Sequence, residues 1–217
     1  MTIILEALSE VCNLLGGLLL EGADTDLLAR LRDAKAVSAC VESVGGALGS
    51  SLVRLQAELE RGELMDVAVD YTRLMVTDAT AGARGPLPVP PWEDCHHGHE
   101  RQVMGERGQA AFRAYVSAGL GFDDMTTRPA DHIGLELCFV AALLMEEVDG
   151  ERDDRVRAAF VREHLDVFAP RIGGALANKA RCGVWTAVGL ALIALSPLLR
   201  PKSGRGVPVL QDHPGTE

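Results

Sequence analysis

The chain has 217 residues, of which 47% are hydrophobic and 24% are charged, so it is not an intrinsically disordered protein and is long enough to bury a core. Its formal net charge of −10 repels phosphate backbones, and we therefore expect no nucleic-acid partner. Aromatic residues make up only 4%, while alanine, leucine and valine abound. This composition favours packed helices over a β-sandwich or barrel.

The cysteines indicate the redox compartment. They are odd in number, widely spaced and never form a CxxC pair: Cys12, Cys40, Cys95, Cys138 and Cys182. This spacing is not that of a disulfide framework, so a reducing cytoplasm is the expected location.

The N-terminal segment has helical periodicity. Its apolar residues recur at steps of four and three, on one face of a helix: Ile4, Leu8, Val11, Leu15 and Leu18. A signal peptide is not expected, because no positively charged region precedes the apolar run and Glu6 and Glu10 interrupt it.

Three more helical runs follow in the first half of the chain. Asp24 or Thr25 is placed to cap the second of the four runs. A glycine-interrupted segment at residues 44–50 separates it from a third run that ends at Gly62, and a fourth covers residues 63–76. Prolines then predict a loop from residue 77 to 98, because proline cannot continue a helix.

The second half is also predicted to be helical. The clearest helix begins at Asp131, and its apolar stripe comprises Ile133, Leu137, Val140, Leu144 and Val148. The next helix is predicted to end at Pro170. Residues 183–199 are apolar but short for a membrane span, so a buried last helix without stable membrane insertion is expected. The prediction is therefore a single all-α domain over residues 1–200, followed by a disordered tail at 201–217.

The loop at residues 86–100, PLPVPPWEDCHHGHE, carries the densest set of reactive side chains: Cys95, His96, His97 and His99. Zinc requires four converging ligands, usually in paired short spacings, and no second pair is evident, so no metal site is predicted. A small metal-dependent or cysteine hydrolase that uses this loop remains the alternative function. The glycines of VGGALGSSL lack the lysine of a phosphate-binding loop, so no cofactor is predicted.

Asp131 and His132 lie at a predicted junction between a loop and a helix, where binding residues often occur. Asp131 also fits an ordinary helix N-cap. Considered without reference to any family, these residues predict a soluble helical binding domain, with the ligand left open.

Four segments nevertheless occur in a recognisable order: YTRLMV at 71–76, PPWEDC at 90–95, DHIGLELCFVAALL at 131–144 and REHLDVFAP at 162–170. Together they resemble the TorD/DmsD family of cytoplasmic chaperones, which mature molybdenum enzymes of the dimethyl-sulfoxide-reductase class. The chain departs from the family pattern at Met75, Asp94 and Phe168, where phenylalanine, serine and tryptophan are common. The histidines of CHHGH replace a segment that usually carries tyrosine.

The resemblance implies an all-helical, non-enzymatic protein that acts as a monomer or homodimer. Such a chaperone binds the twin-arginine signal peptide of an apo-molybdoenzyme, holds the enzyme until its cofactor is inserted, and prevents premature export. The family pattern also implies a peptide-binding surface formed by Tyr71, Leu74, Met75, Pro91, Trp92, Glu93, Asp131, His132 and Glu136. In this surface the apolar side chains anchor the peptide, and Glu93 and Asp131 receive its arginines. His132 is expected to tune affinity near its ordinary pKa of about 6.5. The client enzyme and any nucleotide binding stay open.

Overall fold

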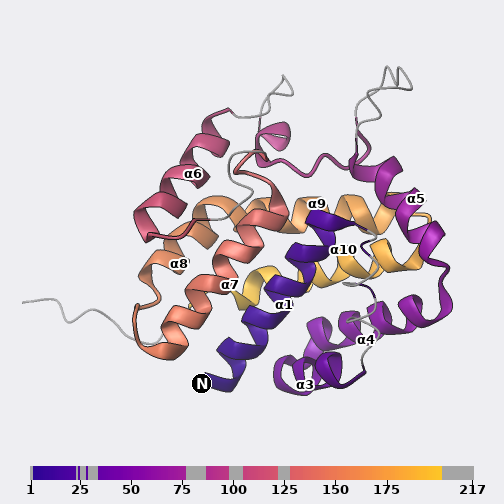
Figure 1. Ribbon diagram of the computed structural model, residues 1–217, viewed down its shortest axis with the longest axis horizontal. Coiled ribbons are helices and arrows are strands. Elements are labelled where there is room, and N and C mark those ends of the chain that lie inside the picture. Colours follow the sequence, from indigo (N-terminus) through magenta and orange to yellow (C-terminus); the bar gives the residue numbers. More distant parts are fainter. Residues whose placement is uncertain are drawn as a thin grey trace, which may run out of the picture.

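The computed structural model describes residues 2–22, 24, 28, 34–76, 87–97, 105–121 and 128–201. Over these ranges the chain is all-α without a β-strand, which confirms the predicted fold class (Figure 1). The helices are α1 (Thr2–Glu21), α3 (Ala34–Val44), α4 (Gly46–Arg61), α5 (Leu64–Met75), α6 (Glu106–Ala118), α7 (Ile133–Asp149), α8 (Arg155–Phe160), α9 (Asp166–Lys179) and α10 (Gly183–Leu195). Short 3-10 turns cover Glu93–His96 and Ser196–Leu198, and a π-helical turn covers Val161–Leu165. Most of the predicted second helix and the tail from residue 202 lie outside the described residues.

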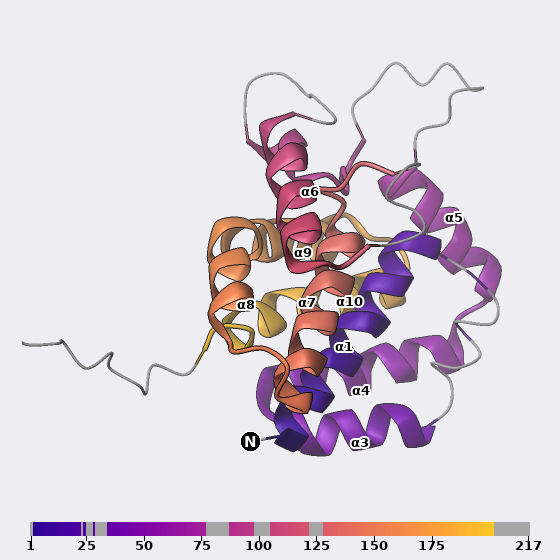
Figure 2. The ribbon, with the colours of Figure 1, turned by 60° about the vertical axis from the view of Figure 1, so that its left-hand side comes forward.

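The centre of the molecule is the antiparallel pair α1 and α7, which lie side by side in both ribbon views (Figures 1 and 2). The predicted stripe of α1 is buried except for Ile4, which is 39% exposed. Glycines let the two backbones approach closely, because a Cβ on Gly134 would lie 2.8 Å from the carbonyl oxygen of Gly16. On the far side of this pair, α10 packs against α4 and α9.

The last long helix is buried, as the sequence predicted. Val184, Trp185 and Leu192 of α10 are fully buried, and the Trp185 indole donates a hydrogen bond to the carbonyl of Val67 at 2.9 Å. Among the described helices, α1 alone is both long and apolar enough to cross a membrane by length and composition, and half of its most apolar window is buried within the protein. A core helix meets the same criteria, so this feature alone is weak evidence for a membrane span.

The predicted helix end at Pro170 is wrong, because α9 continues to Lys179. A π-helical turn precedes it, and the amide of Asp166 bonds to the carbonyl of Val161, five residues back. Proline removes one backbone hydrogen bond and crowds the carbonyl four residues earlier. Burial of Ile172 and Leu176 further along the same helix offsets this cost.

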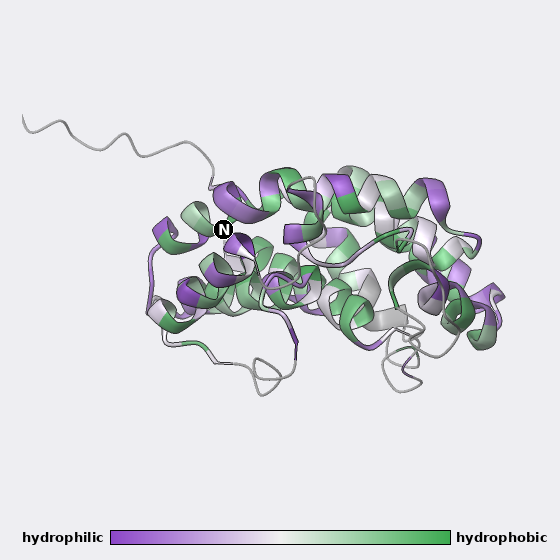
Figure 3. Ribbon diagram, turned by 90° about the horizontal axis from the view of Figure 1, so that it is seen from above, coloured by the Kyte–Doolittle hydropathy of each residue, from purple (hydrophilic) through white to green (hydrophobic). Residues whose placement is uncertain are grey.

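The outer helices lie on opposite sides of the central pair. In Figures 1 and 2, α6 and α8 lie on one side and α4 and α5 on the other. Hydrophilic and hydrophobic residues alternate along many of the helices, as expected for helices with one buried face (Figure 3). Residues 87–97 run from the end of α5, where the amide of Val89 donates to the carbonyl of Leu74, to the start of α7, where they place the PPWE sequence.

Candidate functional site

The structure joins the PPWE segment to the DHI segment through backbone hydrogen bonds. The amide of Glu93 donates to the carbonyl of Asp131 at 2.9 Å, and the amide of Ile133 donates to the carbonyl of Pro91 at 2.9 Å. Between these bonds, Trp92 and His132 form an isolated antiparallel bridge, with their rings edge to face at 6.3 Å. Two motifs that are distant in sequence therefore form one site.

Asp94 and Asp131 fasten this site to α6. The amide of Asp94 donates to Oδ2 of Asp131 at 2.9 Å. In turn, the two carboxylate oxygens of Asp94 accept the amides of Arg107 and Gly108, each at 3.0 Å, in the first turn of α6. A carboxylate at a helix N-terminus is favourable, because the first amides lack partners within the helix. Gly108 suits this contact, since a Cβ there would lie 3.3 Å from carboxylate oxygens of both aspartates.

His132, and not Asp131, is the N-cap of α7. Nδ1 of His132 accepts a hydrogen bond from the amide of Gly134 at 3.1 Å, so the predicted Asp131 cap is wrong. The expected titration of His132 near neutrality is also wrong. Burial, together with the nearby positive charge of Arg128, lowers the pKa of His132 to about 3. The imidazole is therefore neutral at physiological pH and acts as a hydrogen-bond acceptor.

Beneath the bridge, three buried side chains converge from three different elements. Nδ1 of His164, in the π-helical turn, lies 2.6 Å from Oε2 of Glu93 and 3.8 Å from Oε1 of Glu136. Oε1 of Glu93 and both carboxylate oxygens of Glu136 have no hydrogen-bond partner. Burial, with nearby carboxylates, raises the pKa of Glu136 well above its usual range. The cluster is thus rich in carboxylate and poor in compensating charge.

Glu93, Glu136 and His164 also have the donor types for a divalent cation. Their ligand atoms all lie within 4.8 Å of one another, which makes this the convergent donor group within the described part of the chain. The described members of the Cys95–His99 cluster, Cys95, His96 and His97, do not form such a group. Nε2 of His96 lies 2.9 Å from the carbonyl of Pro90, and its ring packs against Phe168 at 5.2 Å. His99 lies outside the described residues.

Three of the predicted anchors, Tyr71, Leu74 and Met75, lie in the interior of the fold. Leu74 and Met75 are at most 3% exposed. Half-buried Tyr71 donates from its hydroxyl towards the carbonyls of Leu19 and Leu20, which lie at the end of α1. The structure thus gives these three side chains packing contacts, and their contact with a peptide stays a prediction.

The remaining predicted residues do come together around the bridge. Pro91 is buried, Trp92 is half-buried, and Glu93, Asp131 and Glu136 are 0% exposed. The indole Nε1 of Trp92 is buried and has no hydrogen-bond partner.

Other members of the site were not predicted from the sequence: His164, Asp94, Arg107 and Tyr115. Tyr115 supports the turn before α7 by donating to the carbonyl of Ala130 at 2.7 Å. His164 does belong to the REHLDVFAP motif, and that membership was the available signal. Nothing in the local sequence around Arg107 or Tyr115 indicates that α6 packs over the PPWE segment.

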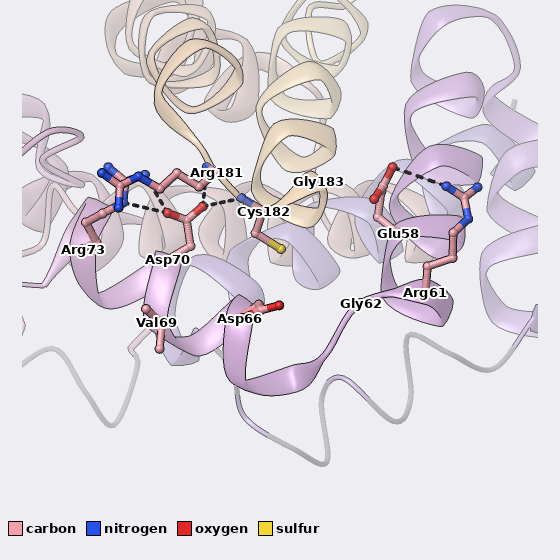
Figure 4. A pocket seen from close by; sticks show the side chains of 10 residues that line it. All are labelled: Glu58, Arg61, Gly62, Asp66, Val69, Asp70, Arg73, Arg181, Cys182 and Gly183. Carbon is pink, nitrogen blue, oxygen red and sulfur yellow. Dashed lines mark hydrogen bonds and ion pairs between the residues drawn. The ribbon is translucent and has the colours of Figure 1, made fainter.

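Two cavities lie near the surface of the described part of the chain. The first, of about 360 Å³, lies between α6 and α8, and its lining includes Glu163 and His164. The second, of about 440 Å³, lies where α4, α5 and the turn before α10 meet (Figure 4). There Asp70 accepts the amides of Arg181 and Cys182 at 2.7 and 2.8 Å and pairs with Arg73, so its buried carboxylate fixes the turn before α10.

Comparison with known families assigns the chain. Residues 42–172, more than half of the sequence, match the family model described as the nitrate reductase delta subunit. The chain belongs to this family. Its members are maturation chaperones of the NarJ and TorD type, which confirms the resemblance seen in the motifs and makes the chain a redox-enzyme maturation chaperone whose partners are molybdoenzymes.

The fold has a counterpart among solved structures. A redox enzyme maturation protein from Archaeoglobus fulgidus superposes with a TM-score of 0.52 at 21% sequence identity, covering 84% of this chain and 91% of that one. At this identity the likeness concerns the fold. No protein in the curated comparison set matches the chain.

Proposed function

We propose that this chaperone binds the twin-arginine signal peptide of an apo-molybdoenzyme and retains the enzyme in the cytoplasm until its cofactor is inserted. In this proposal the protein has no catalytic activity of its own. Its work is to shield the signal peptide from the export machinery and to release it after maturation.

The observation that carries the proposal is the group of four carboxylates joined to the Trp92–His132 bridge. Glu93, Asp94, Asp131 and Glu136 come from two motifs and are all buried. Three of them retain oxygens without a hydrogen-bond partner. Buried carboxylates of this kind are stabilised most strongly by a cation that donates hydrogen bonds, and a guanidinium donates several in a planar arrangement.

Trp92 supports the apolar half of the same interaction. Its side chain is half-buried beside the carboxylates, so part of the indole is open to a partner. A partly exposed aromatic side chain next to charged groups is typical of an interface anchor. The net charge of −10 adds long-range attraction for a basic peptide.

A peptide titration tests the proposal. The parent should bind a twin-arginine leader peptide of a molybdoenzyme, as measured by calorimetry, and should bind the twin-lysine version at least about tenfold more weakly, because lysine lacks the planar fork. Trp92→Ala should weaken binding by about 2 kcal/mol or more. Equal affinity for the arginine and lysine peptides would contradict recognition of arginine at this site.

The alternative of a hydrolase that uses Cys95 and His96–His99 has less support. His96 is engaged with Pro90 and Phe168, and the convergent donor group lies at Glu93, Glu136 and His164. A stoichiometric metal in the purified protein, lost on changing His97 but not Glu136, would favour that alternative.

A further inference from the structure

One cation of the chain itself already lies beside the buried carboxylates. Arg107, in the first turn of α6, has a side chain that is 38% exposed and a guanidinium Nε at 3.9 Å from Oε1 of Glu93. Its Nη1 donates to the backbone carbonyl of Glu163 at 3.1 Å. A partly exposed guanidinium thus lies beside the buried carboxylate of Glu93.

The contact between Arg107 and Glu93 is loose. At 3.9 Å it is too long for a hydrogen bond, whereas a charge-assisted bond between a guanidinium and a carboxylate is about 2.7–2.9 Å long. Oε1 of Glu93 accordingly has no hydrogen-bond partner, although Nε2 of the exposed His97 also lies 3.3 Å away. The other oxygen of Glu93 is held by His164. The carboxylate of Glu93 is therefore held in position, while its Oε1 lacks a hydrogen bond.

We infer that Oε1 of Glu93 and the carbonyl of Glu163 form a guanidinium subsite, and that Arg107 is its internal occupant, which an arginine of the client replaces. The inference rests on the proposed function and specifies where one client arginine binds. Because Glu93 is 0% exposed in this structure, the inference requires the Arg107 side chain to swing away before a client arginine reaches the carboxylate.

The exchange is favourable for a geometric reason. Arg107 is anchored at its backbone, where its amide donates to Asp94, and this anchor limits how its side chain can approach Glu93. The side chain of a client arginine is not restrained in this way. Two of its guanidinium N–H groups can therefore align with Oε1 of Glu93 and with the carbonyl oxygen of Glu163. Because Arg107 competes for the same place, it lowers the apparent affinity by the fraction of time that it occupies the subsite.

The first test uses Nα-acetyl-arginine amide as the probe and follows the indole signal of Trp92, one of only two tryptophans, by NMR. Arg107→Gln keeps the backbone amide that donates to Asp94 and removes the competitor, so it should bind the probe about three to ten times more tightly than the parent. Arg113→Gln is the matched control, because Arg113 is exposed on the same helix, and it should bind as the parent does. Equal or weaker binding by Arg107→Gln overturns the inference.

Two further arms separate this subsite from the proposed function. Nα-acetyl-lysine amide should bind Arg107→Gln at least about fivefold more weakly than the arginine probe, because an ammonium cannot span both acceptors. Equal binding of the two probes would show a general cation site and overturn the guanidinium assignment. If the arginine probe binds as expected while a twin-arginine leader does not, the subsite stands and the signal-peptide function fails.

Discussion

Asp131 shows how burial shapes the chemistry of the site at the scale of one residue. Its side chain is 0% exposed. Burial raises its pKa to about 6, and the charge of the Asp94 carboxylate adds to the rise, against a lowering by the hydrogen bond from the Asp94 amide. A proton on Asp131 therefore relieves repulsion inside the cluster, and the charge of the site depends on pH.

The raised pKa predicts a specific pH dependence of stability. Between about pH 4 and pH 6 the folded protein holds a proton on Asp131 that the unfolded chain has lost, so the free energy of unfolding falls as pH rises through this window. Asp131→Asn resembles the protonated form and cannot ionise, so its free energy of unfolding does not fall in this window for this reason. We expect its stability relative to the parent to increase by about 2 kcal/mol from pH 4 to pH 7, measured by urea unfolding. Parallel stability curves for the two proteins would contradict the raised pKa.

At this scale the sequence indicated several residues that the fold brings together, but not the contacts that they make. The motifs indicated Glu93, Asp131 and Glu136 because they occur in a recognisable order. Their burial depends on α6, which covers them through Asp94, and no local pattern predicts which helix covers a loop. For the same reason the cap of α7 was predicted at Asp131, whereas the structure places it at His132.

At the scale of elements, the contact between α1 and α7 depends on two glycines. A Cβ at Gly134 would lie 2.5 Å from Cγ of Leu20 and 2.8 Å from the carbonyl oxygen of Gly16. Backbone atoms cannot move aside as a flexible side chain can, so the helices would have to separate. Because α7 starts at the His132 cap, their spacing also positions the candidate site.

Gly134→Ala is therefore predicted to destabilise the protein by about 1–3 kcal/mol, because an added methyl overpacks the helix contact. Gly174→Ala is the matched control: Gly174 lies within α9, and an added Cβ would meet nothing within 4 Å. That substitution should stabilise by up to about 1 kcal/mol through helix propensity. Thermal unfolding of both variants measures the contrast, and a neutral Gly134→Ala would mean that the helices tolerate a wider spacing.

Helical periodicity was sufficient to predict most of these elements, since α1, α4 and α5 each bury one face, whereas α7 is buried on nearly all sides over residues 133–144. It failed at Pro170, where the breaking tendency of proline was outweighed by burial of the helix that follows. The π-helical turn before it could not be predicted, because its wider hydrogen-bonding pattern has no apolar period of its own.

At the scale of the whole molecule, the chain carries a net charge of −10, and four buried acidic residues lie in its candidate site. A cationic peptide is therefore attracted before it makes any contact, and long-range attraction raises the rate of association more than it slows dissociation. Such attraction is screened over about 10 Å at roughly 0.1 M salt, whereas contacts inside the buried subsite are screened much less.

Varying the salt concentration should therefore separate the long-range attraction from the contacts inside the buried subsite. We expect the association rate of a twin-arginine leader to fall at least about fivefold between roughly 20 mM and 300 mM salt, while its dissociation rate changes by less than about twofold. The twin-lysine peptide carries the same charge, so its association rate should fall in parallel, although it dissociates faster at every salt concentration. A twin-glutamine peptide should show a smaller dependence. Stopped-flow measurements with a labelled leader supply both rates. If salt acted mainly on dissociation, the arginine contacts would have to lie on the exposed surface, away from Glu93 and Asp131.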